Sequence, residues 1–391
     1  MQQVVVRGTG MTRFGRHLDR TLKDLAAEAV RAALDDAGVD VGAIDAIVCA
    51  NSLAGLITGQ ECIRGEVVSF PLGFGSIPIH NVENACASGA NALHLAWLMV
   101  ASGLHRTVLA LGVEKANHED RQRTFAAYKA GFDPDEMPEL APGSGTDRTP
   151  LVDRQAQLAR DLMERHGLDR EALAAIAARS LANAAKNPVA HRRFGATVDD
   201  VLAARMVVDP ITTLMSSPVS DGAAAAVVTA ADEPRPRDVR IAASRLATRP
   251  PLSRPDGPSA TRTAVSAALR DAGVTPDQVD VAELHDASVA YEVIAWQETG
   301  LCPPGHERAW ATSGHTEIGG SLPINPSGGL VGRGHALGAS GIAQVHELVQ
   351  QLRGEAGERQ VDGARVALAH VGGGVIGWQT AVAAAHVLVK G

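Results

Sequence analysis

Two stretches from the first half of the chain recur in the second half, and this internal repeat restricts the fold more than any other feature. Residues 29–45 (AVRAALDDAGVDVGAID) align with residues 264–280 (AVSAALRDAGVTPDQVD). Residues 86–93 (CASGANAL) align with residues 335–342 (HALGASGI), in the same order along the chain. Self-similarity of this kind indicates a duplicated structural unit. We therefore expect two halves of similar structure related by a pseudo-twofold axis.

Each copy of the first stretch predicts a helix, a turn and a strand. In the first copy Thr21 is a suitable N-cap with Asp24 three residues later, and Gly38 is a suitable helix end. The apolar residues between them follow the spacing of one helix face: Leu22, Leu25, Ala26, Ala29 and Ala33. The apolar runs 46–50 and 281–284 then predict a buried strand in each half.

The second stretch places Cys86 and His335 at equivalent positions, each in front of an apolar helix rich in small residues. Unpaired N–H groups and the positive end of the helix dipole favour an anion there and lower the pKa of a thiol. The pseudo-twofold relation would bring the two side chains face to face, which predicts a thiolate–imidazole pair. A lone Cys is more often a small buried hydrophobe, but the matching position favours a nucleophile.

Length, charge and cysteine usage exclude several classes of protein. A chain of 391 residues is too long for one ordinary core, so two domains are expected. The net charge of -8, with no basic block, argues against nucleic acid or an anionic membrane as partner. The four Cys residues form neither a disulfide framework nor a zinc pattern, and neither an apolar span nor a charged leader is visible. We expect a cytoplasmic protein without bound metal.

Six motifs occur in order along nearly the whole chain and resemble those of a known superfamily. They are NACASGANAL (84–93), GVEK (112–115), SSPVSDGAAAAVV (216–228), ELHDAS (283–288), INPSGGLVGRGHALGASG (324–341) and HVGGG (370–374). On these motifs the chain resembles the thiolase superfamily, within its sterol-carrier-protein-type and archaeal-type branch. The resemblance implies an α/β protein with a thiolase-like five-layered α-β-α-β-α fold, acting on acyl-CoA thioesters as a homodimer.

The resemblance also implies roles for individual residues. Cys86 would take the acyl group as a thioester, and His335 would hold its proton. His285 would donate a hydrogen bond towards an oxyanion, and the backbone N–H groups of Cys86 and Gly372 would form the other oxyanion hole. Donors of this kind contribute roughly 3 kcal/mol each when aimed at developing charge. Coenzyme A enters as the thioester substrate, with no covalently bound cofactor.

One departure from the thiolase pattern concerns the group that moves the proton on the substrate α-carbon. The second Cys that many thiolases carry in a C-terminal CxG motif is His370 here, as expected for this branch. Relatives in the branch recover a thiol from the sequence HDCF, whereas this chain has Ala287 and Ser288 in HDAS. Alanine cannot move a proton, and an unperturbed Ser hydroxyl is too weak an acid near neutral pH.

Three functions are compatible with this departure. The first is a specialised thiolase-like acyltransferase that makes or cleaves a C–C bond, or acylates a specialised acceptor, with His370, His285 or a water moving the proton. The second is a retro-aldol lyase with Tyr291 as the proton carrier. The third is a non-catalytic subunit of thiolase fold. Retro-aldol cleavage needs no acyl-enzyme, so Cys86 favours the first, and the Cys-His-His set argues against the third.

The chain divides into two predicted halves with one long insertion. Residues 1–232 form the N-terminal half and residues 239–391 the C-terminal half, with a linker at 232–238. The segment of about 116–210 is more charged and carries Pro and Gly between helical patterns, which predicts an insertion between strands. By resemblance, this insertion is the loop domain that lies over CoA and shapes the acyl pocket.

The insertion and the family also suggest ligands and partners. Arg154 and Arg160 could contact CoA phosphates, although a solvated helix face is the favoured interpretation. Relatives of the archaeal type often join a separate zinc-ribbon and OB-fold protein that binds or channels CoA. This sequence contains no such domain, so a separate partner chain is a hypothesis. No pattern of residues specifies the acyl group.

Overall fold

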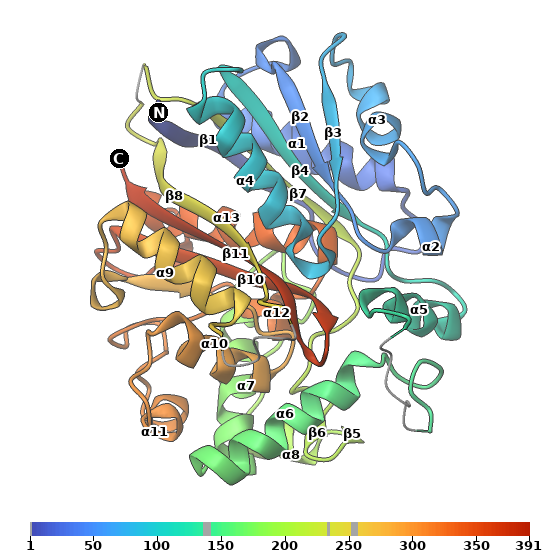
Figure 1. Cartoon of the computed structure of the whole chain (residues 1–391), viewed down its shortest axis with the longest axis vertical. Coiled ribbons are helices and arrows are strands. Elements are labelled where there is room, and N and C mark those ends of the chain that lie inside the picture. Colours follow the sequence, from blue (N-terminus) through green and yellow to red (C-terminus); the bar gives the residue numbers. More distant parts are fainter. Residues whose placement is uncertain (1, 136–141, 233–234, 252–256) are drawn as a thin grey trace.

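The computed structural model describes residues 2–135, 142–232, 235–251 and 257–391. Its main sheet has nine strands in the order β3-β2-β4-β7-β1-β8-β11-β10-β9, and β5 and β6 form a separate pair (Figure 1). In chain order the strands are β1 (Val4–Met11), β2 (Ala46–Ala50), β3 (Ile79–Val82), β4 (Thr107–Glu114), β5 (Met206–Val208), β6 (Ile211–Thr212), β7 (Gly222–Ala230), β8 (Val239–Thr248), β9 (Val281–Glu283), β10 (Val366–Ile376) and β11 (Gln379–Lys390).

Four strands in each half of the main sheet have the same topology, and β3 is an additional edge strand of the N-terminal half. In the N-terminal half β2 pairs parallel with β4, and both β4 and β1 pair antiparallel with β7. In the C-terminal half β9 pairs parallel with β10, and both β10 and β8 pair antiparallel with β11. The halves meet where β1 pairs with β8. The internal repeat predicted from the sequence is therefore a repeat of strand order and direction.

Helices cover these half-sheets in three layers. Helices α4 and α13 contact strands of both halves and form the middle layer, while α1 covers the N-terminal half and α9 the C-terminal half (Figure 1). The expected five-layered α-β-α-β-α fold is confirmed. The helices are α1 (Leu22–Ala37), α2 (Ala54–Thr58), α3 (Arg64–Ser69), α4 (Ser88–Ala101), α5 (Arg121–Ala127), α6 (Leu151–His166), α7 (Arg170–Ala185), α8 (Val198–Ala203), α9 (Ala260–Ala272), α10 (Val289–Thr299), α11 (Glu307–Thr312), α12 (Gly329–Arg333) and α13 (Leu337–Arg353).

Small residues let the two middle helices approach each other closely at their first turns. A Cβ on Gly89 would lie 2.7 Å from the carbonyl oxygen of Gly338, and a Cβ on Gly341 would lie 2.8 Å from the Cβ of Ala90. Larger side chains would force the helices apart. This contact brings the residues in front of both helices to the same region, as the repeat had predicted.

Local signals in the sequence placed the ends of several elements correctly. Thr21 Oγ1 accepts from the backbone N–H of Asp24, whose carboxylate accepts from the N–H of Thr21, and Gly38 ends α1 with φ 63°. The predicted strand 46–50 is β2. The predicted strand 281–284 ends one residue early as β9, because the N–H of Leu284 donates to a side chain instead of the sheet.

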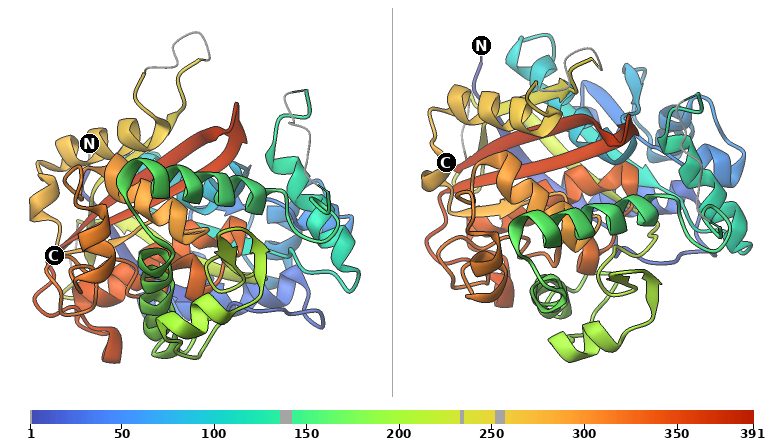
Figure 2. Two further views of the ribbon diagram at one scale, coloured as in Figure 1. Left: turned by 90° about the horizontal axis from the view of Figure 1, so that it is seen from below. Right: turned by 60° about the horizontal axis from the view of Figure 1, so that its bottom comes forward.

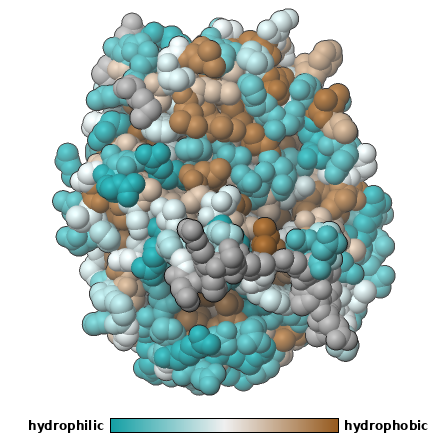
Figure 3. Space-filling view, viewed as in Figure 1, coloured by the Kyte–Doolittle hydropathy of each residue, from teal (hydrophilic) through white to brown (hydrophobic). Residues whose placement is uncertain are grey.

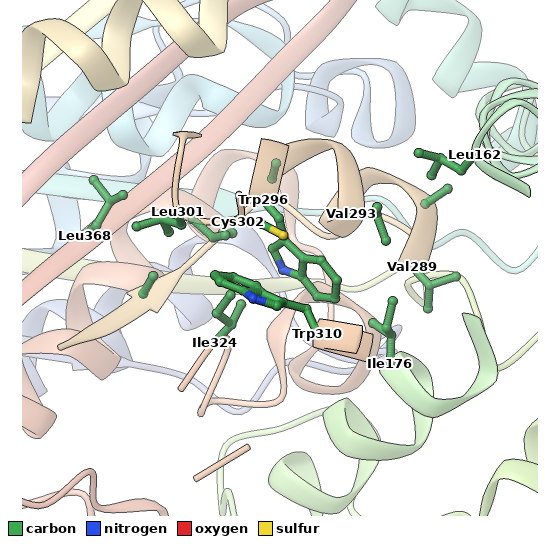
Figure 4. Close-up of a cluster of buried hydrophobic side chains, with 14 of the residues drawn as sticks. Leu162, Ile176, Val289, Val293, Trp296, Leu301, Cys302, Trp310, Ile324 and Leu368 are labelled. Atoms are coloured by element: carbon green, nitrogen blue, oxygen red, sulfur yellow. The ribbon is translucent and has the colours of Figure 1, made fainter. Parts of the chain in front are cut away.

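The helices of the predicted insertion share a core with the C-terminal half. Figure 4 shows part of this core, and its labelled residues are Leu162, Ile176, Val289, Val293, Trp296, Leu301, Cys302, Trp310, Ile324 and Leu368. Seen from below in Figure 2, α6 crosses the molecule beside the ends of β10 and β11. Residues 136–141 of the insertion and 233–234 of the predicted linker lie outside the described residues, and the domain boundaries stay a prediction.

Candidate active site

A cavity of about 500 Å³ lies where the two halves and the inserted helices meet. Four predicted site residues line it: Cys86 from the turn before α4, His285 from the loop after β9, His335 from the loop before α13, and Gly372 from β10. Helix α6 forms a further wall. Residues that are far apart in the sequence therefore meet at one cavity.

Cys86 lies in a 3-10 turn (Ala85–Ala87) directly in front of α4, which is the helix N-terminus that the sequence predicted. The side chain is 8% exposed and belongs to a small apolar cluster with Leu53 and Leu337. Leu337 is the first residue of α13, so the turn before one middle helix packs against the start of the other.

The pKa of the Cys86 thiol is raised to about 12, and the prediction of a lowered value is wrong. Removal of the thiol from water is the largest cause, and the nearby carboxylates of Glu114 and Glu83 add to it. A backbone hydrogen bond at Cys86 acts in the opposite direction but contributes less. The cavity therefore holds a neutral thiol, and the predicted thiolate–imidazole pair is absent from the described structure.

His335 is held so that one ring nitrogen remains free. Its Nδ1 lies 2.8 Å from Oγ of Ser340, whose hydroxyl donates to the carbonyl of Ala336 at 2.9 Å. Because the hydroxyl proton is used in this way, Ser340 accepts from Nδ1–H, and Nε2 is the basic nitrogen. Burial, with smaller contributions from the neighbouring His285 and Arg333, holds the pKa of His335 well below its usual range, so the imidazole is neutral.

The predicted contact between sulfur and imidazole is not made as a hydrogen bond. Within the described ranges Nε2 of His335 has no hydrogen-bond partner, although Cys86 lines the same cavity. With a neutral thiol and a neutral imidazole, no ion-pair attraction draws the two groups together. The thiol of Cys86 and Nε2 of His335 therefore both line the cavity, and each is available for proton transfer with a ligand.

His285 stands beside His335 in the cavity wall. Its ring is nearly perpendicular to the rings of Tyr291 and His335, with centroid distances of 5.6 and 5.8 Å. The neighbouring Asp286 anchors the loop by accepting from the backbone N–H of Leu330 at 2.6 Å, in the first turn of α12. Burial lowers the pKa of His285 to about 4. The neutral ring can donate one hydrogen bond to a ligand in the cavity.

The glycines of β10 allow this strand to lie against the turn of Cys86. A Cβ on Gly373 would lie 2.8 Å from the backbone N of Ala87 and would overlap with the carbonyl oxygen of Asn84. Gly372 lines the cavity, where its backbone is accessible to a ligand. The glycine run therefore marks a close approach of two backbones, as well as the wall of the cavity.

His370 is the predicted site residue that does not line the cavity. Its Nε2 lies 3.1 Å from Oγ1 of Thr261 in α9, and its Nδ1 has no partner in the part of the chain that the structure describes. Burial and the nearby His285 lower its pKa to about 3. The structure therefore places a neutral His370 behind the cavity wall.

Arg154 and Tyr291 form a pair that the sequence did not indicate. Tyr291 lines the cavity, and Nε of Arg154 donates to its hydroxyl at 2.8 Å. Arg154 is only 7% exposed and its guanidinium also lies 6.0 Å from the ring centroid of Trp378, so its interpretation as part of a solvated helix face is wrong. Its helix packs against α10, which buries this face. Arg160 is exposed, as predicted.

Two family models match this chain. The model described as "Thiolase, N-terminal domain" matches residues 4–232, and the model described as "Thiolase C-terminal domain-like" matches residues 253–386. The chain belongs to the thiolase family. The family predicted from the motifs is thereby confirmed, and so is the expected class of enzyme, an acyltransferase.

Relatives of this thiolase-family chain include both branches that the motifs indicated. "Acetyl-CoA acetyltransferase" of Methanothermobacter thermautotrophicus is 38% identical over 400 residues and is matched over 100% of both chains. "Sterol carrier protein 2" of Gallus gallus is 35% identical over 393 residues, covering 96% of this chain and 71% of the relative. A solved structure named "Ltp2-ChsH2(DUF35) aldolase" has the same fold, with a TM-score of 0.78 at 24% identity over 99% of this chain and 98% of that one.

Sequence reasoning assigned no role to Glu114, which belongs to the GVEK motif of this thiolase. Its buried carboxylate accepts hydrogen bonds from the Asn51 side chain and from the backbone N–H groups of Ser52, Leu53 and Gly338. Burial raises its pKa to about 7. An acidic residue at the end of an otherwise apolar strand was the available signal.

Among the described residues, no group of three or more His, Cys, Asp or Glu is placed to hold a metal ion.

Proposed function

We propose that this chain is an acyl-CoA acyltransferase that works through an acyl-enzyme on Cys86. The reaction makes or cleaves a C–C bond of the Claisen type, or transfers the acyl group to a specialised acceptor. The observation that carries the proposal is the convergence of the Cys86 thiol, the basic Nε2 of His335 and the neutral His285 at one cavity. The relative named acetyl-CoA acetyltransferase supports a CoA thioester as substrate.

In the first step the sulfur of Cys86 attacks the thioester carbonyl while its proton passes to Nε2 of His335. Because the thiol has a high pKa, proton transfer has to accompany the attack. The backbone N–H groups of Cys86 and Gly372 donate to the developing oxyanion and stabilise it by roughly 3 kcal/mol each. The tetrahedral intermediate expels the CoA thiolate, which takes the proton from His335 and leaves an acyl thioester on Cys86.

The second step needs a group that removes a proton from the acyl acceptor. Ala287 lines the cavity where relatives carry a thiol, and Oγ of Ser288 is buried without a partner in the described ranges. His285 is the remaining basic group in the cavity wall, whereas His370 lies behind it. We assign this proton transfer to His285, directly or through a water. An acceptor that is already acidic needs no further base.

A retro-aldol lyase is the second candidate. The position of the Tyr291 phenol in the cavity wall favours it. The phenol lines the cavity and accepts from Arg154, while burial keeps its pKa above the usual value. A neutral Tyr291 could give its proton to the α-carbon of a thioester enolate after His335 has taken the proton of a β-hydroxyl. The fold is shared with the solved structure named as an aldolase.

Intact-protein mass spectrometry separates these candidates. After mixing with acetyl-CoA or butyryl-CoA, the acyltransferase should gain the mass of one acyl group on Cys86, and the variant Cys86→Ser should gain none. Cys62→Ser, which removes an exposed thiol, is the matched control and should still be acylated. Turnover of a β-hydroxyacyl-CoA by Cys86→Ser, without any adduct on the wild type, would instead identify the lyase. Absence of both activities would identify a non-catalytic subunit.

We also propose that the chain is a homodimer formed through the edge of its sheet. Strand β3 ends the sheet, with no strand beyond it among the described residues. Near this edge, Phe70 is 89% exposed and Ile63 is 62% exposed, and Leu98 of α4 is 39% exposed. Figure 3 shows apolar side chains gathered on the face where Figure 1 places α3, β3 and α4. Free edges and exposed apolar side chains favour association.

A dimer of this kind would brace the Cys86 turn, which directly follows β3. Sedimentation velocity should show a dimer for the wild type and a monomer for Phe70→Asp. Leu104→Asp is the control, because Leu104 is a similarly exposed residue (71%) in the loop after α4. A monomeric wild type would contradict the proposal.

A separate zinc-ribbon and OB-fold protein remains a proposed partner. Its support is the solved structure whose name joins Ltp2 to ChsH2(DUF35). Co-purification from the native host tests it, and a fully active isolated homodimer would count against it.

The proposed location is the cytoplasm, since the four cysteines are unpaired. None of the helices in the described ranges is long and apolar enough to cross a bilayer.

A further inference from the structure

Arg192 is a cation in the cavity wall that has no carboxylate partner in the described part of the chain. Its Nη1 donates to the carbonyls of Ser216 at 3.0 Å and Val331 at 2.9 Å, and its Nη2 donates to the carbonyl of Thr213 at 2.8 Å. Burial lowers its pKa to about 10, and no anionic neighbour among the described residues opposes that shift. The guanidinium therefore carries an uncompensated charge at the site of the chemistry.

Three buried arginines of this chain face acidic residues, whereas the buried Arg154 donates to the hydroxyl of Tyr291. Arg179 pairs with Glu292, and Arg333 pairs with Glu283. A third pair, Arg359 with Glu347, is formed in the same way. Burying a cation is unfavourable unless an anion or a full set of acceptors compensates it. Within the described ranges, the partners of Arg192 are three backbone carbonyls and no carboxylate. An anion that enters the cavity would therefore pair with a cation that has no counter-ion there.

The unused donors of Arg192 suit a carboxylate. A guanidinium has five N–H groups, and three are used here, which leaves Nε–H and one N–H on Nη2. Two other arginines of this protein use the same two atoms, Nε and Nη2, to bind a carboxylate. Arg7 binds Asp238 in this way, and Arg237 binds Glu355. Planar two-point binding of this kind is what distinguishes a carboxylate from other acceptors.

The position of Arg192 points to the acyl end of the substrate. Its acceptor Ser216 also bonds the Gln155 side chain at 2.8 Å and lies 3.4 Å from the carbonyl of Ala287, where relatives carry the thiol. Val219, three residues further on, pairs with His335. The guanidinium is thus hydrogen-bonded to the segment that borders the reacting groups. Arg205 also lines the cavity, but its side chain is exposed to solvent.

We propose that Arg192 binds a carboxylate on the acyl group, so that the preferred substrates are thioesters of dicarboxylic acids with CoA. This inference rests on the proposed function for the thioester chemistry, but the binding step can be measured without it. An acyl group that ends in a methyl leaves the guanidinium unpaired. An acyl group that ends in a carboxylate forms a bidentate pair that is shielded from water.

A pair of inert CoA thioethers tests the binding step by isothermal titration calorimetry. S-(3-carboxypropyl)-CoA and S-butyl-CoA share the same chain, and only the first carries the carboxylate. The wild type should bind the carboxypropyl compound about 10- to 100-fold more tightly, as expected for a hydrogen-bonded charge pair. Arg192→Gln keeps donors for the carbonyls and should abolish this preference, with little effect on the butyl compound. Arg192→Lys should retain part of the preference.

Arg205→Gln is the matched control, because Arg205 also lines the cavity but is exposed. It should leave the ratio of the two affinities unchanged. Equal binding of both thioethers to the wild type overturns the proposal. An equal loss for both thioethers in Arg192→Gln also overturns it, because that result would assign the residue to the CoA moiety. Failure of Cys86 to become acylated contradicts the proposed function and leaves this affinity ratio intact, so the two failures are distinguishable.

Discussion

The carboxylate of Glu114 in the N-terminal half accepts a hydrogen bond from the backbone N–H of Gly338 in the C-terminal half at 3.0 Å. Gly338 lies in the first turn of α13, three residues after His335. The other oxygen of the same carboxylate accepts from the N–H of Leu53, which packs against Cys86. One buried acid therefore ties the nucleophile side of the cavity to the base side.

Glu114→Gln should destabilise the fold. Both carboxylate oxygens accept from N–H donors, so an amide NH₂ would face a donor whichever way it turned. Each buried polar group left unpaired costs about 1–3 kcal/mol. Urea unfolding followed by circular dichroism measures the loss. The control Glu28→Gln changes an exposed acid and should shift the unfolding free energy by less than about 0.5 kcal/mol. An unchanged midpoint for Glu114→Gln would contradict this account.

Alkylation of Cys86 by iodoacetamide should be slow at neutral pH and should accelerate with pH. Burial raises the pKa of this thiol to about 12, so the reactive thiolate fraction grows about tenfold for each pH unit between 7 and 10. Quantitative mass spectrometry of the two Cys-containing peptides gives the rates, with the exposed Cys62 as internal control. A rate for Cys86 that is already constant from pH 7 upward would mean that a thiolate–imidazole pair exists before substrate binds.

Gly373→Ala should impair catalysis through the Cys86 turn. Its Cβ would overlap with Asn84 O, so the turn would have to move away from β10 and carry the sulfur with it. Misplacement of a reacting atom by about 1 Å can cost 100-fold in rate, and we expect a loss of this order in the acylation rate. Gly195→Ala is the control, because no atom of the described residues lies within 4 Å of its added Cβ. Normal acylation of Gly373→Ala would show that the turn tolerates the shift.

The buried His386 should make the fold sensitive to acid. Ser244 Oγ lies 2.8 Å from Nδ1 of His94 and 2.9 Å from Nδ1 of His386. Burial, with a contribution from His94, lowers the pKa of His386 from 6.5 to about 3. Below pH 6.5 the unfolded chain binds a proton at this residue and the folded chain does not. The stability contributed by a neutral His386 is therefore present above pH 6.5 and is lost as the pH falls towards 3.

The variant His386→Asn isolates this effect. The difference in unfolding free energy between the wild type and the variant should be constant above pH 7 and should narrow by about 1.4 kcal/mol for each pH unit below 6.5. Urea titrations at pH 8, 7, 6 and 5 measure it. The exposed His306, replaced by Asn, is the matched control for the substitution itself. A gap for His386→Asn that stays constant down to pH 5 would refute the burial argument.

Much of the fold was predictable because its signals are local or repeated. The cap at Thr21 and the turn at Gly38 depend on residues within one helix, and the apolar run of β2 depends on five consecutive positions. The repeat added a long-range prediction, since equivalent positions of two similar halves meet at the pseudo-twofold axis. It placed Cys86 and His335 at one cavity, although they lie in different halves.

The prediction of a hydrogen-bonded ion pair failed for a reason that no local pattern contains. The sequence shows that Cys86 precedes a helix, but it does not show how much water reaches the sulfur or that Glu114 lies nearby. The interpretation of Arg154 as a solvated residue was wrong for the same reason. Helical spacing alone does not reveal that α6 directs this side chain towards Tyr291. His370 belongs to a motif of the site, yet its ring contacts Thr261 behind the wall.

The sequence by itself determined the family, the order of elements and which residues come to the cavity, because these depend on spacing along the chain and on the duplication. Only the tertiary structure decided which groups are charged there, which ring nitrogen is free and that Arg192 has no counter-ion among the described residues. Desolvation and Coulomb interactions act through space, so the protonation state of a side chain depends on neighbours that folding brings from distant parts of the sequence.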